Sequence, residues 1–145
     1  MIFESKMTRR ALAFGAVALL ALGACSDSEE EEEEPDVATM RVTIGAPVVD
    51  FSGGCTPSVA GVTIPTTGAQ VSAAFLRADQ TPDPVVTAAE FELAVTPESR
   101  FTRTSAFAGT LSGGAAGQAQ VSFALFHKEE MHEDYGPCSL TVTVQ

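Results

Sequence analysis

Apolar and polar residues alternate with a period of two along much of the chain after residue 37. Such alternation places one face of a strand on a core and the other in water, as in antiparallel sheets. Two weaker patterns, within residues 62–64 and 101–111, predict further strands. The clear patterns predict strands within residues 39–44, 70–75, 90–95, 118–125 and 139–144.

Clusters of Gly, Pro and Ser separate these segments and are typical of turns. Strands at this spacing favour a β-sandwich or a small barrel. No long amphipathic helix and no internal repeat is visible in the sequence. We therefore predict an all-β fold, a single antiparallel β-sandwich of about seven strands over residues 37–145.

A different pattern precedes residue 37. Three basic residues within the first ten precede an uncharged, largely apolar run over residues 11–24, which ends at Cys25. This order is that of a secretory signal peptide. The run is too short for a transmembrane helix, which needs about 20 apolar residues. We therefore expect residues 1–24 to be a signal peptide.

The segment Leu22-Gly23-Ala24-Cys25 resembles the lipobox of bacterial lipoproteins. The resemblance implies lipidation of Cys25 and attachment of the processed protein to a membrane. One acyl chain alone binds a membrane only marginally, so multiple acylation is expected. Ser26, in place of Asp, resembles the signal for outer-membrane rather than inner-membrane retention. The implied location is the cell envelope, with the outer membrane favoured if the source is Gram-negative.

An acidic run, from Glu29 to Glu34, lies close behind Cys25. Six consecutive like charges repel one another and cannot form a core, which favours a disordered, solvated segment. We expect residues 25–36 to tether the folded domain to the lipid. Alternatively, an acidic run at this position resembles the surface-export signal of some bacterial lipoproteins.

The charge balance excludes one class of partner. The chain has a formal net charge of −11, and residues 37–145 alone carry ten acidic and five basic residues. Nucleic acids require clusters of Lys and Arg to neutralise their phosphates. We therefore expect no nucleic-acid partner, and we expect the acyl chains rather than anionic lipid headgroups to hold the protein on the membrane.

The chain has three cysteines, of which Cys25 belongs to the lipobox-like segment. The remaining two, Cys55 and Cys138, form an even pair in an exported protein, which favours a disulfide. A redox or metal-binding pair is the alternative. The sequence contains no Cys-x-x-Cys motif, so the structural disulfide is the preferred interpretation.

Both histidines lie in one acidic segment, over residues 127–134. Imidazole and carboxylate groups suit Zn²⁺ or Cu²⁺, which makes His127, Glu130, His132 and Asp134 candidate metal ligands. The alternative is a polar connection between two strands, in which these charges are simply solvated. We favour the solvated connection, since a structural zinc site normally shows four convincing ligands.

Nothing in the sequence favours catalysis. There is no Gly-x-Ser-x-Gly motif, and the two histidines share one short segment, so no catalytic residue and no cofactor is expected. The predicted domain is similar to the immunoglobulin-like β-sandwich modules of bacterial surface proteins in strand count and size. It departs from true immunoglobulin domains, because Tyr135 precedes Cys138 by three residues rather than two and the chain has no Trp.

These observations favour a lipid-anchored β-sandwich that acts as a non-catalytic binding or structural module. Its expected partners are the membrane, through the N-terminal lipid, and an unidentified envelope protein or polymer. The alternative function is that of a metal-binding envelope lipoprotein, which would use the segment from His127 to Asp134.

Overall fold

The computed structural model describes residues 33–145. The predicted signal peptide, the predicted lipidation site Cys25 and the first part of the predicted acidic tether lie outside the described residues. Within them the fold is all-β, with ten strands and one turn of 3₁₀ helix, η1 (Glu98–Arg100). In this part of the chain no helix is long and apolar enough to cross a membrane. The prediction of an all-β fold is confirmed.

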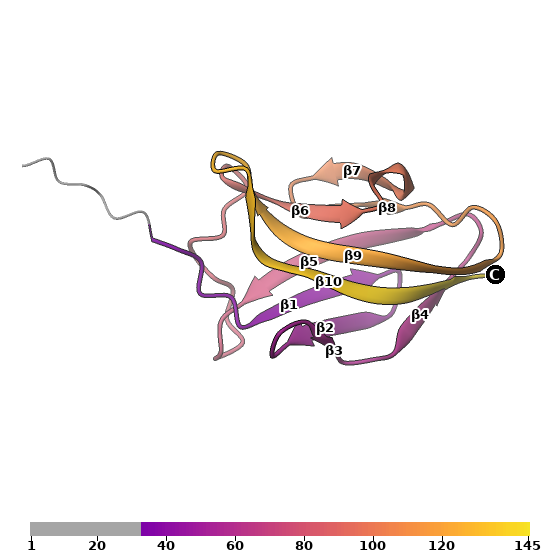
Figure 1. The fold of residues 1–145 in the computed structure, drawn as a ribbon, viewed down its shortest axis with the longest axis horizontal. Coiled ribbons are helices and arrows are strands. Elements are labelled where there is room, and N and C mark those ends of the chain that lie inside the picture. Colours follow the sequence, from indigo (N-terminus) through magenta and orange to yellow (C-terminus); the bar gives the residue numbers. More distant parts are fainter. Residues whose placement is uncertain (1–32) are drawn as a thin grey trace, which may run out of the picture. The chain divides into compact units, whose positions relative to one another are not determined.

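The strands form two sheets, which Figure 1 shows as two layers. The first sheet has the order β3-β2-β1-β5-β8-β7, and the second has the order β4-β10-β9-β6. Neighbouring strands are antiparallel, except that β4 and β10 are parallel. The first sheet comprises, in that order, Thr56–Pro57, Val48–Ser52, Thr39–Ile44, Ala69–Leu76, Ala108–Leu111 and Phe101–Ser105. The second comprises Gly61–Ile64, His132–Val144, Gly117–His127 and Phe91–Thr96.

The sequence predicts about seven strands, whereas the described residues hold ten. The additional elements are short. Strand β3 has two residues, and β2 has five, two of which are the adjacent Val48 and Val49 that break strict alternation. The weak pattern over residues 101–111 is a hairpin of two strands, β7 and β8, with a register shift between Arg103 and Ser105.

The apolar stripes of both sheets meet in one core. The inward-facing residues of β1, Met40, Val42 and Ile44, are almost completely buried. Across the interface, Phe51 of β2 lies 6.1 Å, ring centre to ring centre, from Phe123 of β9. Full burial of a large apolar side chain contributes about 1.5–3 kcal/mol. The alternation in the sequence therefore corresponds to the packing of one sheet against the other.

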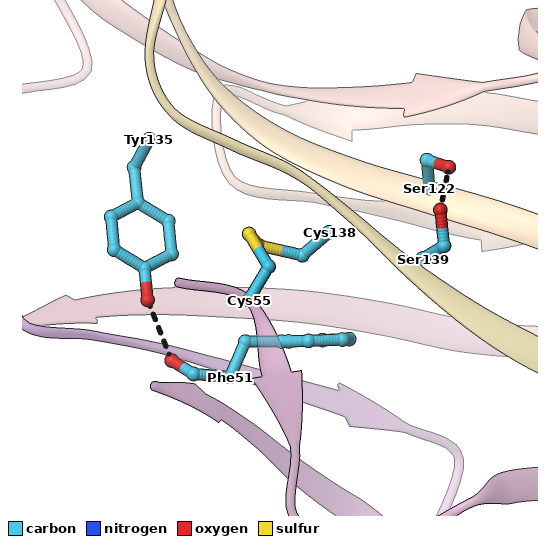
Figure 2. Close-up of a disulfide and its surroundings, with 6 residues drawn as sticks. All are labelled: Phe51, Cys55, Ser122, Tyr135, Cys138 and Ser139. Atoms are coloured by element: carbon cyan, nitrogen blue, oxygen red, sulfur yellow. Dashed lines mark hydrogen bonds between the residues drawn. A yellow bond between two sulfur atoms is a disulfide. The ribbon is translucent and has the colours of Figure 1, made fainter. Parts of the chain in front are cut away.

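Two further contacts join the sheets near the end of β2 (Figure 2). Cys55 and Cys138 form a disulfide across 83 residues of sequence, as predicted. The Tyr135 hydroxyl donates a hydrogen bond of 2.9 Å to the backbone carbonyl of Phe51. Because Tyr135 and Cys138 both belong to β10, they connect this strand to the segment around the end of β2.

A buried carboxylate, that of Asp83, binds the backbone of the N-terminal segment where the chain enters the domain. The Asp83 side chain is fully buried, and its Oδ2 accepts a 2.6 Å hydrogen bond from the backbone N–H of Asp36. Asp83 Oδ1 accepts a second bond, of 2.9 Å, from the N–H of Val85. Two residues beyond Asp36, Ala38 donates to the carbonyl of Leu76 at 2.9 Å. These bonds fix the path of the N-terminal segment from Asp36 onward.

Candidate metal centre

The candidate ligands lie on the hairpin between β9 and β10. His127 is the last residue of β9, His132 is the first of β10, and the two face each other directly in the strand register. The turn between them closes with a 2.9 Å hydrogen bond from the Met131 N–H to the His127 carbonyl. The predicted connection over residues 127–134 is thus shorter than expected, and both imidazoles stand on strand ends, where backbone pairing fixes their spacing.

A β-bulge places Asp134 beside the two histidines. The register of β10 shifts between Glu133, which pairs with Phe126, and Tyr135, which pairs with Leu125. Asp134 therefore has no direct partner on β9. Bulges of this kind change the direction of a side chain. Here Asp134 lies next to His132, and the Tyr135 hydroxyl contacts the backbone carbonyl of Phe51 in β2.

The four candidate residues converge. His132 Nε2 lies 2.8 Å from Asp134 Oδ1, and His132 Nδ1 lies 3.2 Å from Glu130 Oε2. His127 Nδ1 lies 3.7 Å from Glu130 Oε2 and 3.8 Å from Asp134 Oδ2. All four residues that the sequence predicts as candidate ligands therefore lie together in the fold.

Three of these residues meet a stricter geometric criterion. One ligand atom each from His127, His132 and Asp134 lies within 4.8 Å of the other two. With metal–ligand distances of about 2.0–2.2 Å, two ligand atoms on one zinc ion are at most about 4 Å apart. Small side-chain rotations would therefore place all three atoms on one ion. Within residues 33–145 this is the one group of His, Cys, Asp and Glu side chains with such an arrangement.

The carboxylates give the site an affinity for positive charge. The hydrogen bond with Asp134 raises the pKa of His132 above its ordinary value, and the negative charges of Asp134 and Glu130 act in the same direction against partial desolvation. The neighbouring carboxylates thus stabilise a cation at this position. A divalent metal ion can take the place of the proton.

His127 is the more rigidly held of the two imidazoles. Its side chain is only 13% exposed, and its ring stacks on Phe91 at 4.5 Å with an interplanar angle of 29°. Phe91 is itself buried in the core. The stacking presents the ring to the cluster from a fixed scaffold, which lowers the cost of ordering a metal ligand.

A hollow of about 210 Å³ lies over the cluster. Its walls are the four hairpin residues and three residues of the N-terminal segment, Glu33, Glu34 and Pro35. The sequence did not predict that Glu33 and Glu34 would line this hollow, because a run of six glutamates is typical of a solvated tether. No local signal marks them, since their placement depends on the bond between Asp36 and Asp83.

Comparison with known proteins gives no match to a protein family, to a curated protein or to a solved structure.

Proposed function

We propose that this protein is a lipid-anchored, non-catalytic binding module of the cell envelope. The location rests on the lipobox-like segment that ends at Cys25. The module is the β-sandwich of the described residues, for which we propose an immunoglobulin-like arrangement. Two packed sheets of mainly antiparallel strands and a disulfide between them support that arrangement.

We infer that the module binds a divalent transition-metal ion, Zn²⁺ or Cu²⁺, at the β9–β10 hairpin. The observation that carries this function is the convergence of His127, His132 and Asp134 within 4.8 Å. Mixed imidazole and carboxylate donors suit these ions better than Ca²⁺ or Mg²⁺, which prefer oxygen ligands alone. The side-chain geometry thus favours the metal-binding alternative over the solvated connection that the sequence favours.

A second candidate function is binding of an envelope protein or polymer, and one surface favours it. On the outer face of the second sheet, neutral hydroxyl and amide side chains pair across β9 and β10. Gln120 Nε2 donates to Thr141 Oγ1 at 2.8 Å, and the hydroxyls of Ser122 and Ser139 lie 2.8 Å apart (Figure 2). Such a neutral polar face, in a domain that is otherwise acidic, suits a hydroxyl-rich polymer.

Isothermal titration of the purified exported chain with Zn²⁺ tests the metal-binding function. We expect one equivalent to bind with a dissociation constant of about 1 µM or lower, which is about −8 kcal/mol. The variant H127A/H132A should lose this binding. The control E129Q/E133Q, which alters two carboxylates of the same hairpin outside the cluster, should retain it. Zinc uptake that is unaffected by H127A/H132A would contradict the assignment.

A further inference from the structure

The acidic N-terminal segment and the metal-binding hairpin line the same hollow. Glu33 and Glu34 belong to its lining, together with the hairpin residues His127, His132 and Asp134. In Figure 1 the hairpin and the segment through which the chain enters the domain lie at the same, left-hand end. We propose that Glu33 or Glu34 supplies a further ligand to the metal ion, so that the ion latches the N-terminal segment to the hairpin. This inference rests on the proposed metal-binding function.

The segment is held where the latch requires it. The bond from the Asp36 N–H to the buried Asp83 carboxylate fixes the chain two residues after Glu34. A fully extended chain spans at most about 3.3–3.6 Å per residue, so Glu34 lies within about 7 Å of Asp36 and Glu33 within about 11 Å. Their carboxylates therefore remain near the hollow, and little chain entropy is lost when one of them binds the ion.

The hairpin leaves one coordination position of a zinc ion open for a ligand from another part of the chain. Zinc sites built from protein side chains are almost always four-coordinate, and the closely spaced group on the hairpin has three members. Glu130 also borders the hollow, but it lies outside the closely spaced group. A carboxylate of the N-terminal segment, which lines the same hollow, can take the fourth position.

Charge makes the latch dependent on the ion. Four carboxylates, those of Glu33, Glu34, Glu130 and Asp134, surround a hollow of about 210 Å³. These negatively charged carboxylates repel one another across the hollow. A divalent cation among them attracts all of them. Because Glu33 also lies on the covalent path from Cys25 to the domain, metal binding would fix the direction in which the chain leaves the domain towards its anchor.

Matched pairs of glutamate substitutions separate a ligand from general electrostatics. Zn²⁺ titrations of the exported protein would compare E33Q/E34Q with E29Q/E30Q, which removes the same charge from the same acidic run. We expect E33Q/E34Q to weaken zinc binding by at least about tenfold. The control should change it by no more than about twofold, since it leaves both glutamates that line the hollow, Glu33 and Glu34, in place. Equal weakening in both variants, or none in either, would overturn the latch.

The two proposals fail in distinguishable ways. If H127A/H132A binds Zn²⁺ as tightly as the unaltered chain, the metal-binding function itself is wrong. If H127A/H132A loses binding but E33Q/E34Q behaves like E29Q/E30Q, only the latch is wrong.

Proteolysis gives an independent readout. A glutamate-specific endoprotease can cleave the bond between Glu33 and Glu34 but not the bond between Glu34 and Pro35, because proline blocks the site. We expect Zn²⁺ to slow cleavage between Glu33 and Glu34 in the unaltered chain, as measured by mass spectrometry of the fragments. The same zinc concentration should leave cleavage of H127A/H132A unchanged, which controls for any effect on the protease. Equal cleavage rates of the unaltered chain with and without zinc would contradict the latch.

Discussion

The surroundings of His132 would make the proposed metal binding depend on pH. Its two ring nitrogens face the carboxylates of Asp134 and Glu130 at 2.8 and 3.2 Å. Metal binding requires at least one of these nitrogens to be free of its proton. Because the hydrogen bond with Asp134 raises the pKa of His132, the proton competes with the metal ion up to a higher pH than for an ordinary histidine.

The first prediction is that zinc binding weakens on acidification, starting above the unperturbed histidine pKa of about 6.5. The sign follows from the raised pKa of His132, since this imidazole holds its proton through a higher pH range before the metal displaces it. Competition titrations with a chelator at pH 8, 7 and 6 would measure the dissociation constant. A constant value over this range would show that no imidazole binds the ion.

A second residue-scale prediction concerns Asp50. Two hydrogen bonds from the Arg41 guanidinium, of 2.7 and 2.8 Å, lower the pKa of Asp50 below its usual value. A carboxyl group with a lowered folded-state pKa stabilises the fold above its unfolded pKa of about 3.9. That contribution disappears as the pH falls through the lower, folded-state pKa.

The substitution Asp50→Asn should therefore reduce the melting temperature at pH 7 and have much less effect at pH 2. Thermal unfolding followed by circular dichroism at the two pH values checks this expectation. A reduction of equal size at both values would show that packing, rather than charge, is what Asp50 contributes.

Among the strands, the alternation of buried apolar and exposed polar residues is what made the fold predictable. The stripes in β1, β5, β6, β9 and β10 follow from one face being buried, so the sequence alone locates them. The edge strand β3 was missed, because its two residues carry no pattern. The hairpin of β7 and β8 was predicted only as one weak segment, since its bulge interrupts the alternation.

The candidate site was predictable to the same extent. Both histidines and their acidic neighbours lie within eight residues of one another, so a local sequence pattern reveals them. The bulge that leaves Asp134 beside them and the stacking of His127 on Phe91 are properties of strand pairing. The position of Glu33 and Glu34 beside the hairpin depends on the hydrogen bond from Asp36 to Asp83. These two residues are 47 positions apart, so no local sequence pattern can indicate the bond.

The disulfide gives a prediction at this scale. It joins Cys138 of β10 to Cys55, which lies between β2 and β3, and the two residues are 83 positions apart in the sequence. Removing such a bond from a small exported domain costs about 2–5 kcal/mol. Urea unfolding of C55A/C138A should show a loss of this size, and Tyr135→Phe, which removes only one hydrogen bond between the sheets, should lose about 1 kcal/mol. An unchanged midpoint in C55A/C138A would contradict the structural role.

For the whole molecule, the charge of the β-sandwich bears on how the protein is held at a membrane. With ten acidic and five basic residues after position 36, the domain has no electrostatic attraction to an anionic membrane. We propose that a lipid on Cys25 supplies the attachment instead, and more than one acyl chain is then needed for stable anchoring.

This anchoring is tested by Cys25→Ser. The variant should remain unprocessed, should incorporate no palmitate analogue during metabolic labelling, and should carry no acyl chain. The unaltered chain should be labelled and should partition with membranes on fractionation. Full lipid labelling of the serine variant would show that the lipobox resemblance is misleading.

X-ray absorption spectroscopy of the zinc-loaded protein would show directly whether the β9–β10 hairpin is a metal site. We predict two imidazole nitrogens at about 2.0–2.1 Å from the ion, together with carboxylate oxygens. The imidazole signal should be absent from H127A/H132A. A zinc ion surrounded by oxygen ligands alone in the unaltered protein would contradict the account.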